Sequence, residues 1–208
     1  MQEEKLKTGT TTVGLVCKDC VILASETQST LGNMISSKKV QKIYQIDDKI
    51  AITTAGGVGD VQTLIRMIKA EINIYKLTRN SNFTTQAAIT LLANILQSTR
   101  YFPYMAMLVM GGVDKNGFHV YSIDPVGGVE KDNFVATGSG SPMALGVLED
   151  KYKEDMSKED GIELAVRAIR SAKGRDIYSA SGKEIRVVVI DKDGVVFVDQ
   201  EKIKQIEK

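Results

Sequence analysis

Hydrophobic residues along this chain follow two periodicities, which change from one block of sequence to the next. The first block contains short β-branched runs bounded by turn residues, which predict strands at Thr11–Cys17, Cys20–Ser25, Ile43–Ile46 and Ile50–Thr54. The next block places apolar residues three and four positions apart, which predicts a helix from Val61 to Tyr75 and another over Thr84–Ser98. Strands therefore precede a pair of helices.

The second half of the chain shows the same order of blocks. Strands are predicted at Ala106–Met110, His119–Ile123 and Phe134–Ala136. A second pair of helices is predicted from Pro142 to about Tyr152 and from Ser157 to Lys173. Two strands, Ile185–Ile190 and Val195–Val198, close the chain. Ser157 followed by Asp160 fits a capping box. Helices that arrive in pairs argue against a doubly wound parallel fold. The order favours two facing antiparallel sheets, each covered by helices, in one α+β domain.

Composition excludes several classes of function. The chain has 208 residues, 43% of them hydrophobic, which is enough for one domain with a substantial core. Its 27 basic and 26 acidic residues give a net charge of +1, so no electrostatic case for nucleic acid arises. The charged first residues contain no apolar signal region, and no stretch approaches the roughly 18–20 apolar residues of a membrane span. A cytoplasmic protein without membrane contact is expected.

The two cysteines form a C-x-x-C motif at Cys17 and Cys20, which is typical of a redox pair or of half a zinc site. A zinc site needs further ligands, and the rest of the chain offers no cysteine and a single histidine, His119. We favour two strands joined by the two-residue turn Lys18-Asp19, and we interpret His119 as an ordinary strand residue. No metal and no cofactor are therefore expected.

The most informative chemical signal is the run Gly9-Thr10-Thr11-Thr12-Val13-Gly14. Thr10 could be an ordinary β-branched strand residue. If the peptide bond after Gly9 is cut, however, Thr10 gains an α-amine beside its own hydroxyl. The reference pKa of an α-amine is about 8, so that near neutrality it can act as a base. Thr10 would then combine a nucleophile and a base in one residue.

These residues and several later motifs together resemble the proteasome β subunits of the archaeal type, which are N-terminal-nucleophile hydrolases. The motifs are Gly9–Gly14, Ala24-Ser25-Glu26, Lys42-Ile43-Tyr44, Ala55-Gly56-Gly57-Val58-Gly59-Asp60, Gly138-Ser139-Gly140-Ser141-Pro142 and Arg175-Asp176-Ile177-Tyr178-Ser179. The resemblance implies a four-layer αββα sandwich. It also implies a leader over residues 1–9, removed by autocatalytic cleavage after Gly9, and a single hydrolase domain over residues 10–208.

The resemblance also implies roles for the residues around Thr10, whose hydroxyl would attack the scissile carbonyl. Lys42 matches the active-site lysine, and a cation beside the amine favours its neutral, basic form. Glu26 matches the acidic partner of that lysine, where many members of the family carry aspartate. Asp176, Ser139 and Ser179 match the group that orients the amine. Ser179 is favoured over Ser181, although the sequence after Asp176 departs from the Ser-Gly-Gly usual in the family.

Substrate contacts are implied in the same way. Gly56 matches the residue whose N–H forms the oxyanion hole, and Thr30 and Gly56 would pair with an extended substrate as an added strand. The specificity pocket would be formed by Ser29, Val40, Tyr44, Thr54 and Val58. This set carries no charge, which predicts a preference for neutral, mostly apolar side chains before the cut.

The implied protein is a threonine endopeptidase that degrades unfolded polypeptides. It would work in seven-membered β rings stacked with rings of α subunits, and an ATPase ring would bind through the α ring. One alternative within the family is an unprocessed, catalytically silent β subunit with a structural role. A dinucleotide-binding alternative rests on Gly56-Gly57-Val58-Gly59. It fails the G-x-G-x-x-G pattern, because the third glycine position, counted from Gly57, is Gln62.

Overall fold

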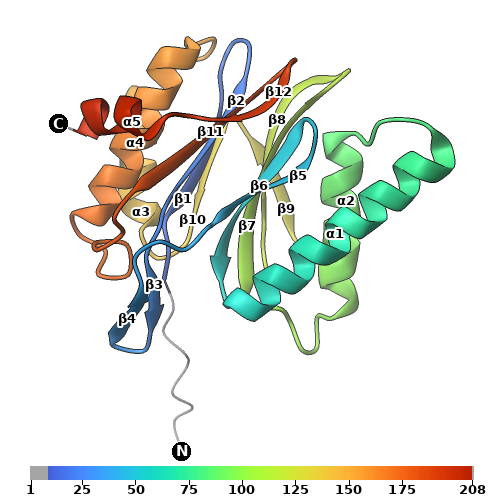
Figure 1. The fold of residues 1–208 in the computed structure, drawn as a ribbon, viewed down its shortest axis with the longest axis horizontal. Coiled ribbons are helices and arrows are strands. Elements are labelled where there is room, and N and C mark those ends of the chain that lie inside the picture. The colour runs from blue at the N-terminus through green and yellow to red at the C-terminus, as the bar shows by residue number, and fades with distance from the viewer. Residues whose placement is uncertain (1–8, 208) are drawn as a thin grey trace, which may run out of the picture.

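A computed structural model describes residues 9–207, in which two five-stranded antiparallel sheets face each other between layers of helices (Figure 1). The first sheet has the strand order β10-β1-β2-β11-β12. Its strands are β1 (Thr12–Val16), β2 (Val21–Glu26), β10 (Phe134–Thr137), β11 (Ile185–Asp191) and β12 (Gly194–Phe197). The central strand β2 lies between β1 and β11 and ends at Glu26, so the first sheet brings Glu26 close to the start of β1.

The second sheet has the strand order β5-β6-β7-β8-β9. Its strands are β5 (Ile43–Asp47), β6 (Ile50–Gly56), β7 (Ala106–Asp114), β8 (Gly117–Ile123) and β9 (Val129–Asp132). A separate hairpin of β3 (Ser29–Leu31) and β4 (Met34–Ser37) connects the two sheets along the chain and projects beyond them in Figure 1.

Helices cover the outer face of each sheet (Figure 1). The helices α1 (Val58–Arg79) and α2 (Thr85–Ser98) pack on the second sheet, and α3 (Ser141–Lys151), α4 (Lys158–Lys173) and α5 (Gln200–Glu207) pack on the first. No helix among residues 9–207 is long and apolar enough to span a lipid bilayer.

The inner strands of the sheets are buried on both faces, which explains why strands such as β2 and β6 read as continuous apolar runs. In β2, Ile22 and Ala24 join the core beneath the helices, whereas Val21 and Leu23 join the core between the sheets. Side chains alternate across a strand, so β2 contributes to two apolar layers at once. Burying apolar surface at about 25 cal/mol per Å² is the main force that holds the four layers together.

The predicted αββα sandwich of antiparallel sheets is confirmed, and each predicted strand and helix overlaps an observed one. The structure adds four elements that the pattern did not predict, namely β3, β4, β9 and α5. The three strands lack a buried apolar face, and α5 is a helix of only eight residues that buries Ile203 alone, so few apolar positions mark any of the four. The predicted leader lies outside the described residues except for Gly9.

Of two local predictions, the hairpin turn is confirmed and the capping box is confirmed in part. The Cys17 amide donates to the Cys20 carbonyl at 2.8 Å across the Lys18-Asp19 turn, and both cysteines are buried and free of a disulfide. At the start of α4, the Ser157 hydroxyl accepts the Asp160 amide at 3.1 Å. The Asp160 carboxylate accepts the Ser157 hydroxyl at 2.7 Å, instead of the Ser157 amide that a full capping box would use.

Candidate active site

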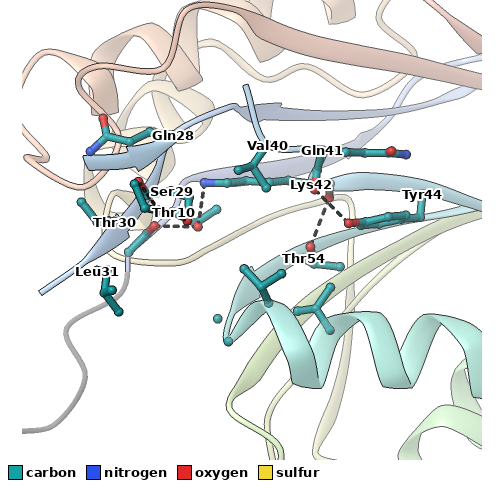
Figure 2. Close-up of a pocket in the computed structure, with 16 residues that line it drawn as sticks. Thr10, Gln28, Ser29, Thr30, Leu31, Val40, Gln41, Lys42, Tyr44 and Thr54 are labelled. Atoms are coloured by element: carbon teal, nitrogen blue, oxygen red, sulfur yellow. Dashed lines mark hydrogen bonds between the residues drawn. The ribbon is translucent and has the colours of Figure 1, made fainter. Parts of the chain in front are cut away.

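Thr10 lies at the end of the sandwich where several strand and helix ends converge. It precedes β1, while Glu26 and Gly56 end β2 and β6, and Lys42 immediately precedes β5. Ser139 precedes α3, and Asp176 and Ser179 lie in the loop after α4. Antiparallel strands and short connections thus bring residues far apart in sequence to one place. Figure 2 shows the Lys42 side chain reaching towards Thr10.

Lys42 and Glu26 form the first arm of the site, which acts on the Thr10 hydroxyl. The Lys42 Nζ donates to Thr10 Oγ1 at 2.9 Å, and this hydroxyl donates to the Gly9 carbonyl at 2.7 Å. Lys42 also forms an ion pair with Glu26 Oε1, and both side chains are almost completely buried. A buried ammonium therefore contacts the hydroxyl directly and is balanced by a buried carboxylate.

Burial dominates the electrostatics of this pair. Removal from water lowers the pKa of Lys42 from its usual value, against the opposing effect of the Glu26 carboxylate. Burial likewise raises the pKa of Glu26, against the effect of Lys42 and of the amides of Gln28 and Thr11. The Thr11 amide donates to Glu26 Oε1 at 3.3 Å, and the Gln28 amide donates to Oε2. Each charge therefore depends on its partner to remain ionised.

Ser139, Asp176 and Ser179 form the second arm of the site, which acts on the Thr10 nitrogen. The Thr10 N–H donates to Ser139 Oγ at 3.2 Å, and the Ser139 hydroxyl donates to Asp176 Oδ2 at 2.7 Å. The Ser179 hydroxyl donates to the same carboxylate oxygen at 2.6 Å. The hydroxyls of Ser179 and Thr11 also lie 2.7 Å apart. These contacts connect the Thr10 nitrogen to a carboxylate through one hydroxyl.

Two glycines at the site adopt conformations that few other residues could. Gly56 has a φ of +139°, and a Cβ there would lie 1.9 Å from the Met105 carbonyl oxygen. Gly138 has a φ of +93°, and a Cβ there would lie 2.0 Å from the Thr10 carbonyl oxygen. Glycine alone lets the backbone approach so closely at these points. The backbone of Gly56 therefore borders the cavity beside Thr10 with no side chain of its own to cover it.

A cavity of about 310 Å³ opens beside Thr10 (Figure 2). All six residues predicted to contact substrate line it, namely Ser29, Thr30, Val40, Tyr44, Thr54 and Val58. Gly9, Thr10, Lys42 and Gly56 line it as well. Among the described residues that line the cavity, Lys42 is therefore the one with a charged side chain.

The structure brings together all seven residues predicted to act on Thr10 or on the substrate carbonyl. It also separates the two candidate serines of the loop: the Ser179 hydroxyl contacts Asp176, whereas Ser181 contributes its backbone N–H to Gln28 Oε1. Sequence reasoning missed six lining residues, which are Gln28, Leu31, Ser36, Gln41, Gly57 and Val61. Leu31 and Ser36 belong to the hairpin of β3 and β4, which no apolar period marks.

Comparisons with known proteins show which family the chain belongs to. The family model described as "Proteasome subunit" matches residues 6–190. A protein of Methanosarcina barkeri named "Proteasome subunit beta" is 52% identical over 207 residues, which cover 99% of this chain and 97% of the relative. Proteins of the same name from Ferroglobus placidus and Archaeoglobus profundus are each 53% identical, over 99% and 98% of this chain and 98% and 94% of the relatives. The chain therefore belongs to the proteasome subunit family.

Proposed function

We propose that this protein is a threonine endopeptidase, the proteolytic β subunit of a 20S proteasome that degrades unfolded proteins to peptides. The names of the relatives support a β subunit with protease activity. The observation that supports a threonine mechanism best is the 2.9 Å contact between Lys42 Nζ and Thr10 Oγ1, with Glu26 behind the lysine. No other hydroxyl in the described part of the chain is contacted by so deeply buried an ammonium.

Activation requires the chain to cut itself. The Thr10 hydroxyl, already hydrogen-bonded to the Gly9 carbonyl oxygen, attacks the Gly9 carbonyl carbon. The acyl group moves from the Thr10 nitrogen to its oxygen, and water then hydrolyses the resulting ester. The products are a carboxylate on Gly9 and a free amine on Thr10.

Peptide hydrolysis then uses both functional groups of Thr10. The neutral amine accepts the hydroxyl proton while the oxygen attacks the substrate carbonyl, and the proton passes to the leaving amine. The positive charge of Lys42 disfavours a second cation nearby and so keeps the amine neutral. Ser139 and Asp176 hold the amine nitrogen, and the Gly56 N–H stabilises the oxyanion. Water hydrolyses the acyl-enzyme and restores Thr10.

Substrate selection follows from the cavity beside Thr10. An extended peptide pairs with the backbone of Thr30 and Gly56 as an added strand. The side chain of the substrate residue before the cut enters the cavity. Apart from Lys42, the residues that line the cavity are neutral, and they include Val40, Tyr44 and Val58. We therefore expect cleavage after neutral, mostly apolar residues.

The protein works inside an assembly, in our proposal. The printed names of the relatives support a multi-subunit proteasome. We infer seven-membered β rings that contact α subunits and other β subunits, with an ATPase ring bound through the α ring, in the cytoplasm. Exposed apolar side chains on α1, such as Ile74 and Leu77, which are 54% and 85% exposed, support contacts with neighbouring subunits.

Removal of residues 1–9 should depend on assembly. The subunit is expressed alone and together with α subunits, and each product is examined by size-exclusion chromatography, intact mass and peptide hydrolysis. We expect an uncut, inactive small species when it is alone, and an active particle that lacks residues 1–9 with α subunits. Complete cleavage in a stable monomer would contradict the dependence on assembly. An assembled, inactive particle that retains residues 1–9 would instead support the silent structural subunit.

Glu26→Gln should move the alkaline limb of the pH–rate profile to lower pH. The Glu26 carboxylate raises the pKa of Lys42, so the loss of its charge lowers that pKa further. Lys42 then loses its proton, and the enzyme loses its activity, at a lower pH than in the wild type. The profile of kcat/KM is measured on protein expressed without residues 1–9. Glu163→Gln, which removes an exposed carboxylate paired with Arg167, is the control and should leave the profile in place. An unshifted alkaline limb in Glu26→Gln would show that the charge on Lys42 is not required.

A further inference from the structure

Gln28 is a completely buried polar residue to which neither the sequence nor the proposed mechanism gives a role. It follows Glu26 by two positions and lies at the junction between β2 and the hairpin of β3 and β4. An uncharged amide with no exposed surface loses its hydration, and this costs free energy unless each polar atom has a partner. In this chain, both ends of the amide have one.

The Gln28 side chain spans the loop that follows α4. Its Nε2 donates to the Ile177 carbonyl at 3.0 Å, and its Oε1 accepts the N–H of Ser181. These contacts bracket Ser179, two residues from each. The partners also determine the orientation of the amide, because a carbonyl faces the nitrogen and an N–H faces the oxygen.

The bracketed residue connects this loop to Thr10. Ser179 donates to Asp176 Oδ2, and the same oxygen accepts the Ser139 hydroxyl, which contacts the Thr10 nitrogen. The loop also packs directly on the strand end, since a Cβ on Gly182 would lie 2.9 Å from the Thr27 nitrogen and 3.2 Å from Glu26 Oε2. A displacement of the loop would therefore move the carboxylate that orients the Thr10 nitrogen.

The backbone of Gln28 acts on the other arm of the site. Its N–H donates to Glu26 Oε2, which leaves Glu26 Oε1 for Lys42. One residue thus contacts the acidic partner of the lysine through its backbone and the loop carrying Asp176 through its side chain. Figure 2 shows the Gln28 side chain directed away from Thr10 and Lys42; although Gln28 borders the cavity, both side-chain hydrogen bonds go to the loop after α4.

We propose that Gln28 is a positioning residue that fixes the loop of residues 176–182 relative to Glu26, and thereby sets the geometry of both arms around Thr10. This inference rests on the proposed threonine peptidase function. Misplacing a catalytic group by about 1 Å can reduce a rate about a hundredfold. We therefore expect an effect on turnover, with little effect on substrate affinity.

The test compares two substitutions of Gln28 with a matched one elsewhere, all in particles assembled with α subunits and expressed without residues 1–9. Gln28→Leu removes both side-chain hydrogen bonds at similar volume, while Gln28→Glu retains the acceptor for Ser181. Gln86→Leu is the control, because it removes a hydrogen bond with the Tyr121 hydroxyl on the outer side of the second sheet. Each particle is checked by size and thermal melting, and kcat and KM are measured over a range of pH.

We expect Gln28→Leu to lower kcat by about tenfold to a hundredfold at nearly unchanged KM, while Gln86→Leu remains within about twofold of wild type. Gln28→Glu supplies a signature that a packing role would not. Its neutral carboxyl group can still donate to the Ile177 carbonyl, whereas the ionised form cannot donate and also repels Glu26. Its kcat relative to wild type should therefore rise as the pH falls.

Three outcomes would overturn the inference while the wild-type particle is active. They are a Gln28→Leu particle with kcat within about threefold of wild type, a substitution that raises KM alone, and a Gln28→Glu particle whose relative kcat does not change with pH. If Gln28→Leu does not assemble, Gln28→Glu alone decides. An inactive wild-type particle would instead overturn the proposed function, and the inference with it.

Discussion

Replacing Thr10 with alanine should abolish peptide hydrolysis while the fold and the assembly remain intact. The substitution removes the hydroxyl that Lys42 contacts at 2.9 Å, and no neighbouring group within the described residues is placed to take over its attack. The fold should tolerate the change, because Thr10 precedes β1 and makes no ladder contact. We expect a loss of stability on the order of 1 kcal/mol.

Peptide hydrolysis by the purified particle, free of wild-type subunit, is the measurement, and intact mass shows whether residues 1–9 remain. Thr12→Ala is the matched control: it removes a buried hydroxyl that lies 2.7 Å from the Thr137 hydroxyl, two residues from Thr10. We expect Thr12→Ala to cost about 1 kcal/mol of stability and to retain activity. Hydrolysis that persists in the Thr10→Ala particle would rule out Thr10 as the nucleophile.

Replacing Lys42 should reduce turnover by about 10²–10⁴-fold, whether the new residue is alanine or arginine. Alanine removes the cation that keeps the Thr10 amine neutral. Arginine keeps the charge but presents a planar fork in place of a compact ammonium, within a space closed by Glu26 and Thr10. Lys39→Arg, on an exposed residue of the same segment, should leave turnover unchanged. Near-normal turnover of Lys42→Arg would mean that Lys42 supplies only charge.

A loss of activity in Lys42→Ala could also arise from instability, because Glu26 would remain buried without its partner. Breaking such a pair costs about 3–5 kcal/mol. The double substitution Lys42→Met with Glu26→Gln removes both charges and should recover the melting temperature, but not the activity. If turnover recovered together with stability, the role of the pair would be structural.

The fold could be predicted from the sequence wherever an element has a buried apolar face. The helix α4 shows this best, since its buried residues, such as Ile162, Ala165 and Ile169, recur at helical spacing behind a serine cap. The strand β9 shows the opposite, because all four of its residues are exposed and no periodicity marks it. Pairing along the edge of a sheet stabilises β9, and pairing leaves no pattern in a single strand.

The candidate site, like the fold, could be predicted from the sequence only in part. The potential of Thr10 to combine a hydroxyl and an amine follows from its own chemistry and from the preceding glycine. The roles of Lys42 and Asp176 follow from the resemblance alone. These residues lie 32 and 166 positions after Thr10 in the sequence, and only the packing of the two sheets brings them to it. Gln28 left no signal at all. It stands in a polar run, Glu26-Thr27-Gln28-Ser29, that reads as an exposed turn, yet the loop after α4 buries it completely.

The cysteine hairpin has a practical consequence for experiments on this protein. Cys17 and Cys20 are the only cysteines in the sequence, and both are buried, with Gly161 of α4 leaving the space that the Cys17 sulfur fills. The hydrogen bond between the two cysteines, together with burial, raises the pKa of the Cys17 thiol, whereas the same hydrogen bond lowers that of Cys20, so burial is what keeps reagents from both sulfurs. A thiol introduced at the exposed hairpin tip, for example at Asn33, would therefore be the one site that maleimide dyes modify. Fluorescence from that position could follow a peptide as it enters the cavity, without removing any native residue of the core.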